Sequence, residues 1–405
     1  MKIFTKKGRL SYYIIAFLAS GTLYPFIHNF FISRKYGSLI SIVFLGLWLF
    51  SILLFHKKII FPNRFFNLIV LIQGIFFLIC FSLNYSSNVI IQFSFLVLSY
   101  FFIFLCINTF NRESFLNLFI RFNILAGLLS IIGLILVITG FTQVLQVVDY
   151  QGDFKLYNYG FFFVKWGEDL VYELRPAGFY DEPGSFAFIV MLLLLINRKF
   201  YKNRKYEYLL LLLPLVTTSL AHIFTVILYF IFFYLKKRNT KRLLTIIGLL
   251  ISLIFIINTF NEKNDFLSFF KRRTLTRFEG FINGEHDASR QGGIELGPEI
   301  FLKNPFGISR EKVEILYPEF VNETIWGPLI YYGLIGGIIY FLPFISILIN
   351  SMLKKNRDNL IFVIIVFINL FQRPYYMYPL ILLLIYYLFF DNSKSLIINY
   401  KYKSF

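Results

Sequence analysis

Residues 122–142 read FNILAGLLSIIGLILVITGFT, a run without a charged side chain that begins directly after Arg121. A helix of about 20 apolar residues is long enough to cross the ~30 Å hydrocarbon core of a bilayer. The run also lacks the alternation of apolar and polar residues that a half-buried strand would show. It therefore predicts a membrane-spanning helix, and it provides a template for reading the rest of the chain.

Similar apolar runs follow one another along all 405 residues, and charged residues make up only 15% of the chain, well below the usual quarter. We expect an all-α polytopic membrane protein with about 12 transmembrane helices and a single integral membrane domain, residues 1–405. The predicted spans are 11–32, 38–55, 65–83, 89–109, 122–142, 184–197, 207–221, 222–235, 243–260, 324–349, 359–372 and 379–390.

Two of these predictions need comment. The run at 11–32 follows a basic N-terminal segment, but it is too long for a typical signal peptide and lacks a cleavage site, so we interpret it as an uncleaved span. The pair between Glu207 and Leu235 is short and contains Pro214, so it predicts either two short helices or a re-entrant hairpin.

The distribution of charge predicts the orientation. With the N-terminus inside, the predicted cytoplasmic segments hold 25 of the 40 basic residues but only four of the 22 acidic residues. This excess follows the positive-inside rule. The net charge of +18 is then a topology signal, and no nucleic-acid partner is expected. We expect both termini in the cytoplasm and membrane lipids around the spans.

Two segments, at about 143–182 and 261–323, are much longer than the other connections, and both are predicted to be external. They mix Trp, Tyr, Phe, Gly and Pro with charged residues. Long loops in a compact protein are usually functional or disordered, and this composition favours ordered, functional loops.

The first external loop ends in RPAGFYDEPGSFAF, residues 175–188. Arg175 could bind an anion, because its planar guanidinium holds phosphate bidentately, and Glu182 or Asp181 could act as a base. The alternative is structural. Acidic residues before Pro183 would cap a helix at the membrane surface, and Arg175 would only pair with them.

The second external loop contains KRRTLTR, which begins at Lys271, then GEHDASRQGG around Arg290, and then Asn304-Pro305-Phe306-Gly307. External arginines run against the topological preference and suggest anion binding. They could equally neutralise the acidic residues of the same loop in weak surface ion pairs. His286 lies between two acids and is either a solvated loop residue or an acid–base group.

Neither cysteine lies in an external loop, and we find no metal-ligand spacing or nucleotide-binding motif, so no metal or other cofactor is expected. The last segment of interest is NETIWGPLIYYGLIGG, residues 322–337, which opens a late span. Its glycines predict close helix packing.

The ordered set R-P-x-G-F-x-x-E-P-x-x-x-A, R-Q-x-G, N-P-F-G and Y-G-L-I-G-G, placed on two external loops and a late span, resembles the Wzy-type O-antigen polymerases. These enzymes are related to the O-antigen ligases. The resemblance covers most of the chain as architecture and about 50 residues as motif. It implies a glycosyltransferase in the bacterial inner membrane that polymerises undecaprenyl-diphosphate-linked oligosaccharide units for lipopolysaccharide or related surface polysaccharide.

The resemblance implies that the external arginines are functional, and they correspond here to Arg175 and Arg290. We expect Arg175, Arg290 and Glu182 to be catalytic. Further residues are expected to contact the lipid-linked donor and acceptor, namely Asp181, Tyr180, Arg277, Arg273, His286 and Glu323. A chain-length regulator is a further partner that the sequence leaves open.

Two other functions stay open. The related ligases use a histidine before a late span, where this chain has Asn322 and Glu323, which favours a polymerase. A flippase or other transporter would place its functional charges inside the spans. The concentration of charges in two external loops counts against it.

Overall fold

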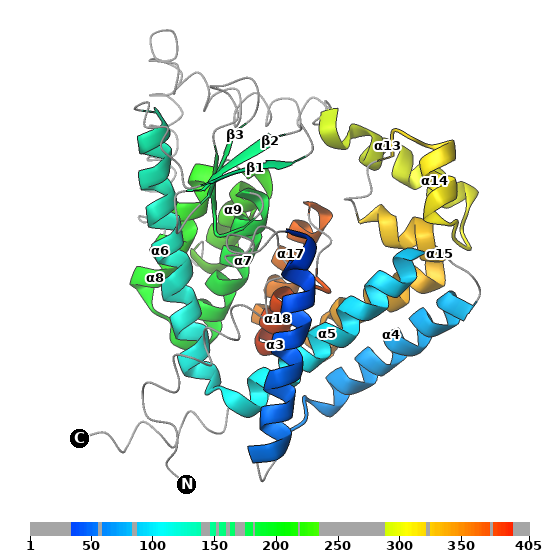
Figure 1. Ribbon diagram of the computed structural model, residues 1–405, viewed down its shortest axis with the longest axis horizontal. Coiled ribbons are helices and arrows are strands. Elements are labelled where there is room, and N and C mark those ends of the chain that lie inside the picture. The colour runs from blue at the N-terminus through cyan, green and yellow to red at the C-terminus, as the bar shows by residue number, and fades with distance from the viewer. Residues whose placement is uncertain are drawn as a thin grey trace.

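A computed structural model describes residues 34–55, 59–82, 87–138, 146–150, 154–158, 163–166, 175–180, 183–217, 219–234, 288–320, 325–372 and 376–391. These residues form helices and one small sheet (Figure 1). Two of the predicted spans, 11–32 and 243–260, lie outside the described residues. The described residues of the other predicted spans overlap helices, with differences at their bounds.

Four long helices form the first part of the chain, and they are α3 (Arg34–Phe55), α4 (Arg64–Ser82), α5 (Ser87–Thr109) and α6 (Arg112–Ile138). Helix α6 begins ten residues before the predicted span. Two arginines that seemed to lie outside the span belong to this helix, and both have partners. Arg112 pairs with Asp391, and Arg121 Nε donates to the Tyr206 hydroxyl at 2.6 Å.

Shorter helices follow. They are α7 (Pro183–Ile196), the π-helix η1 (Asn197–Tyr201), α8 (Arg204–Leu212), the 3₁₀-helix η2 (Leu213–Thr217), α9 (Leu220–Tyr234), α13 (Ala288–Lys303) and α14 (Arg310–Leu316). The last group is α15 (Trp326–Tyr340), α16 (Leu342–Leu353), α17 (Arg357–Gln372), α18 (Pro379–Ile385) and the π-helix η5 (Tyr386–Phe390). Helices α7 and α18 are buried along their length, so they form the centre of the bundle.

Within the described residues, five helices are long and apolar enough to cross a membrane. They span Arg64–Ser82, Val89–Thr109, Arg112–Leu136, Pro183–Tyr201 and Trp326–Leu353. Three shorter apolar helices, Ile42–Leu54, Ala221–Tyr234 and Pro379–Phe390, accompany them. Large apolar side chains on α3, α4 and α6 point outward, as lipid-facing surfaces do, and examples are Leu47, Leu71 and Ile135. The chain therefore has the character of a helical membrane protein.

The first long loop contains a four-stranded antiparallel sheet that the all-α expectation did not include. Its strands are β1 (Gln146–Tyr150), β2 (Phe154–Asn158), β3 (Phe163–Trp166) and β4 (Arg175–Gly178), paired in chain order. The register between β3 and β4 shifts at Phe163 and Val164, as at a β-bulge. Within the described residues of the loop the four strands are paired, and β4 packs against α6 and α7.

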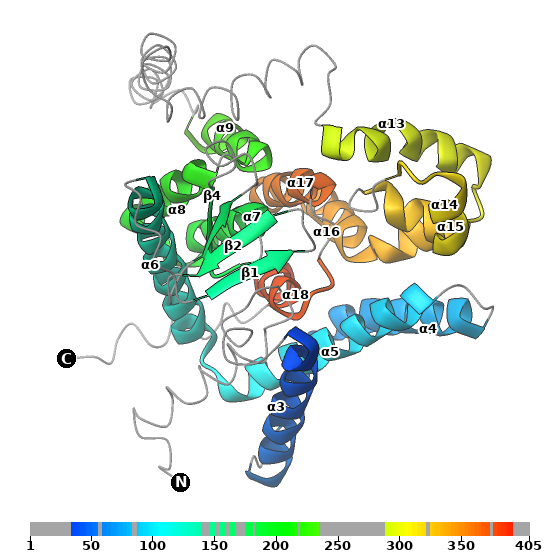
Figure 2. The ribbon, with the colours of Figure 1, turned by 45° about the horizontal axis from the view of Figure 1, so that its top comes forward.

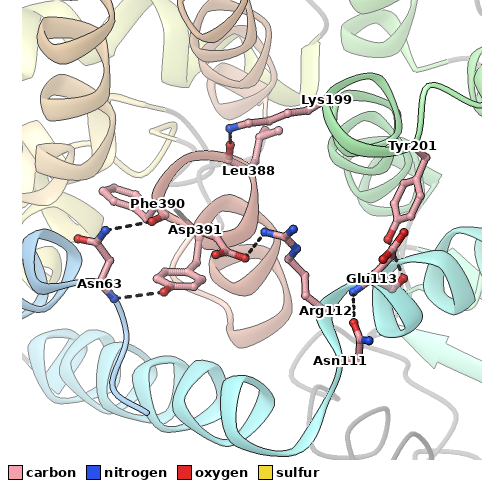
Figure 3. Close-up of polar contacts among 10 residues, drawn as sticks. Asn63, Asn111, Arg112, Glu113, Lys199, Tyr201, Leu388, Phe390 and Asp391 are labelled. Atoms are coloured by element: carbon pink, nitrogen blue, oxygen red, sulfur yellow. Dashed lines mark hydrogen bonds and ion pairs between the residues drawn. The ribbon is translucent and has the colours of Figure 1, made fainter. Parts of the chain in front are cut away.

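Polar contacts join distant parts of the chain around the start of α6 (Figure 3), which is the end of α6 away from the sheet in Figure 1. Arg112 Nη1 lies 2.5 Å from Asp391 Oδ2, and both side chains are 13% exposed. The backbone of Asn63 donates to the Tyr386 hydroxyl at 3.1 Å, and Lys199 donates to the carbonyl of Leu388. We call this the basic end. Helix α6 leads from it to the sheet end, a rise of about 40 Å for its 27 residues.

Candidate functional site

Arg175 begins strand β4, where it pairs with Lys165 of β3, and the next three residues of β4 are buried. Strand β4 is the last strand of the sheet and packs against α6, α7 and η2, while β3 also contacts α6. The sheet therefore carries Arg175 from the predicted external loop into the side of the helical bundle.

The chain turns sharply after β4. Gly178 has a φ of +63°, and a Cβ at this position would lie 2.8 Å from the ring of Phe186 in α7. The backbone N–H of Tyr180 donates to the carbonyl of Ala177 at 3.1 Å and closes the turn. A residue with a side chain would not fit here, so Gly178 sets the direction in which the motif enters α7.

Two aromatic residues attach this turn to α6. The ring of Phe179 stacks on Phe122, with centroids 4.3 Å apart and planes 13° apart. The hydroxyl of buried Tyr180 donates to Asn123 Oδ1 at 2.8 Å. We predicted Tyr180 as a substrate contact, whereas the structure places its side chain in the core as a brace for the motif.

Arg175 reaches the tip of a helical hairpin formed by α8, η2 and α9. Its Nε donates to the carbonyl of Thr217 at 2.7 Å. Helices α8 and η2 together rise about 23 Å, and α9 rises about 22 Å, both less than the ~30 Å core of a bilayer. Each arm is thus shorter than a full span, and the tip of the hairpin lies beside the sheet.

The base of the hairpin is closed by a buried carboxylate at the basic end. Glu207 of α8 accepts from the Tyr229 hydroxyl of α9 at 2.5 Å and lies 3.2 Å from Arg198 Nη1. Asn203 caps α8 by accepting from the backbone N–H of Lys205 at 3.0 Å. These contacts hold the two arms of the hairpin together at its base, while Arg175 contacts its tip.

Helix α13 brings Arg290 to the same end of the molecule as the sheet. Arg290 is the third residue of α13, and this helix begins on the side facing the sheet in Figures 1 and 2. Farther along α13, Lys303 Nζ donates to Glu299 at 2.6 Å, which raises the pKa of the lysine. The structure thus places the Arg290 position near the sheet end and describes nothing of its side chain.

After α13, Asn304-Pro305-Phe306-Gly307 forms a turn, the 304–307 turn, which lies in a break of helix α15. At Gly333 the φ of +70° and ψ of −174° interrupt the helix. Leu334 N–H donates to the carbonyl of Pro305, and Ile308 N–H donates to the carbonyl of Ile330, both at 2.9 Å. The turn therefore replaces part of the helical hydrogen bonding lost at the break.

The sequence prediction for these glycines was partly correct. Gly336 serves close packing, because a Cβ there would lie 2.5 Å from the ring of Phe76 in α4. Gly333 instead breaks the helix, and a Cβ there would lie 2.5 Å from the carbonyl carbon of Phe306. The conspicuous N-P-F-G and Y-G-L-I-G-G motifs were both recognised, but their mutual contact could not be read from either one.

The remaining predicted site residues lie outside the described residues, and their roles stay predictions. They are Asp181, Glu182, Arg273, Arg277, His286 and Glu323. In the part of the chain that the structure describes, no three His, Cys, Asp or Glu side chains group as a metal site. Sequence reasoning missed Asn123 and Thr217, which hold the motif, because each acts across the fold.

Comparisons of the chain with protein-family models, with curated proteins and with solved structures found no match. The fold defines the class of protein, a mainly helical chain with several helices able to cross a membrane. Its site is defined by an arginine-bearing sheet inserted beside a helical hairpin.

Proposed function

We propose that this chain is a membrane glycosyltransferase that polymerises undecaprenyl-diphosphate-linked oligosaccharide units into O-antigen or a related surface polysaccharide. One observation carries the proposal. Arg175 lies in strand β4 and donates to the carbonyl of Thr217, at the tip of a hairpin whose arms are each shorter than a bilayer core. We place this tip near the outer face of the bilayer, at the depth where the diphosphate of a polyprenyl lipid meets the hydrocarbon core.

The chemistry follows from the substrate that such a site can receive. Nucleotide sugars are absent outside the cytoplasmic membrane, so the activated sugar must arrive on a lipid. An acceptor hydroxyl oxygen forms a bond to the anomeric carbon of the donor, and the bond from that carbon to the diphosphate oxygen breaks. The hydroxyl proton passes to a base, for which Glu182 is the candidate nearest to Arg175 in the sequence. Undecaprenyl diphosphate is the leaving group.

Two arginines suit this reaction. A guanidinium is always charged, and its five N–H donors match the oxygens of a diphosphate in pairs. Charge develops on the diphosphate as it leaves, so a positioned cation stabilises the transition state more than the ground state. Arg175, with Nε held by Thr217, is oriented before substrate binds. Arg290, on the helix that begins toward the sheet, is the second proposed cation.

A transporter of lipid-linked glycans is a second candidate, favoured by a specific observation. Helix α15 is discontinuous at Gly333, and substrate sites in transporters are often built on broken helices. His222 is also an ionisable residue buried in a short apolar helix, α9, and Glu207 is buried in α8. Against this, Glu207 is used to close the hairpin base.

A deletion strain separates these functions. We expect loss of a polymerase to reduce the surface polysaccharide ladder on a gel to a single repeat unit, with restoration by the intact gene. Loss of a flippase would instead remove repeat units from the surface and leave them on the cytoplasmic face. Loss of a ligase would leave long chains on the carrier lipid. A full ladder in the deletion strain, with no second polymerase present, would refute the proposed activity.

A further inference from the structure

The 304–307 turn lies beside the interior of a membrane-spanning helix. Its carbonyl at Pro305 and the N–H of Ile308 bond to residues 334 and 330 of α15, and Gly307 contacts the backbone at Tyr331 and Gly333. These contacts belong to the second and third turns of α15. A connection that stayed outside the bilayer would meet only the first residues of the span.

Helix α13 leads down to this position along α15. Gly297 of α13 lies against the ring of Trp326, the first residue of α15, and the ring of Phe301 lies 6.2 Å from that of Trp326. Six residues after Phe301, Gly307 meets Gly333, which is seven residues into α15, or about 10 Å along its axis. Tryptophan is typical of the membrane interface, so the turn lies deeper than the interface that Trp326 marks.

Three large apolar side chains on the turn and its flanks are uncovered. Phe306 is 87% exposed, Leu302 76% and Ile315 78%. On the neighbouring face of α15, Leu334, Ile335 and Ile338 are exposed as well, and they belong to a helix long enough to span a membrane. The apolar surface of the turn is thus continuous with one that a bilayer covers.

Two ion pairs lie beside this surface. Arg310 Nε lies 2.6 Å from Glu314 on α14, and Lys303 Nζ lies 2.6 Å from Glu299 on α13. Helix α14 therefore has a polar face and an apolar end formed by Ile315 and Leu316. This division is typical of elements that lie in the boundary between lipid headgroups and acyl chains.

We propose that the 304–307 turn is inserted into the bilayer, with Phe306, Leu302 and Ile315 among the acyl chains of the surrounding lipid. The segment predicted to be an external loop then enters the membrane at its end and anchors α13, which carries Arg290, to the lipid surface. The contacts with α15 and the exposed side chains support this placement independently of the proposed reaction.

The test is fluorescence quenching on the full-length protein in liposomes. Cys80 and Cys106 are buried and would first be replaced by alanine, and Phe306→Cys would carry an environment-sensitive label. Removal of the Phe306 side chain costs little packing because it is so exposed. The matched control is Glu311→Cys, at an exposed position on the polar side of α14.

The expected result is strong quenching of the Phe306→Cys label by nitroxide-labelled acyl chains, at least about twofold more than at Glu311→Cys, and weak quenching by iodide. Equal access of both labels to iodide would show that the turn is in water and would overturn the inference. Protection of the Phe306→Cys label from both quenchers would also overturn it, because a protein surface would then cover the turn.

Discussion

Gly307 and Gly333 lie backbone against backbone, with φ angles of +98° and +70°. A Cβ on Gly307 would lie 2.9 Å from the backbone nitrogen of Gly333. The contact joins the end of the second long segment to the middle of an apolar helix, α15. The discontinuity of α15 therefore depends on a partner from elsewhere in the chain.

The first prediction concerns this contact. Gly333→Ala should lower the free energy of unfolding of the purified protein in detergent by about 2 kcal/mol or more, and with it the melting temperature. The added Cβ meets Phe306, and a left-handed φ strains an L-residue. The control is Gly46→Ala in α3, where nothing lies within 4 Å of the new Cβ. It should be neutral or stabilising. An unchanged melting temperature for Gly333→Ala would contradict the role of the break.

The second prediction concerns the brace between Tyr180 and Asn123. Tyr180→Phe leaves the buried Asn123 oxygen without this donor, and should cost about 1–2 kcal/mol of stability. In a double-mutant cycle with Asn123→Ala, the two changes should be non-additive by about 1 kcal/mol. Tyr208→Phe, at a 44% exposed position on α8, should have no effect. Full additivity in the cycle would show that the hydrogen bond does not hold the motif.

The third prediction concerns the ion pair at the basic end. Arg112→Ala or Asp391→Ala should each cost about 3 kcal/mol, because either change leaves a mostly buried charge without its partner. The double variant should recover part of the loss. The pair Glu299 and Lys303 is more than half exposed, and the same changes there should cost below about 0.5 kcal/mol. Equal costs at both pairs would exclude an architectural role for Arg112.

The fourth prediction separates the two interpretations of Glu182. If Glu182 accepts the proton of the acceptor hydroxyl, Glu182→Gln should slow chain lengthening by about 100-fold or more, with normal insertion into the membrane. Asp181→Asn should have a smaller effect. A normal ladder from Glu182→Gln on a polysaccharide gel would show that Glu182 is not the base and favour its role as a helix cap.

The helices of this fold were largely predictable, because each long apolar run carries its own signal. The membrane span was predicted to begin at 122 because Arg112 and Arg121 look like residues outside a span. Helix α6 begins at 112, and Asp391 and Tyr206 are the partners of these two arginines. The sheet was missed because strands such as QVVDY and FVKW are short and their pairing is not visible locally.

The site was predictable only as separate motifs. R-P-A-G-F-Y, N-P-F-G and Y-G-L-I-G-G were all recognised as unusual. Arg175 meets Thr217 across 42 residues of chain, and the helix break at Gly333 lies within an unbroken apolar run. Contacts of this kind depend on how helices pack, which no local pattern encodes.

The most direct test of the proposed function is chain elongation by the purified protein in liposomes supplied with carrier-linked repeat units. We predict that Arg175→Ala reduces elongation by at least about 100-fold, that Arg175→Lys restores it only in part, and that Arg204→Ala, an exposed arginine at the basic end, has no effect. Melting temperatures of the variants control for loss of the contact with Thr217. Chains of wild-type length from Arg175→Ala would contradict the central claim, that Arg175 acts on the diphosphate in the working site.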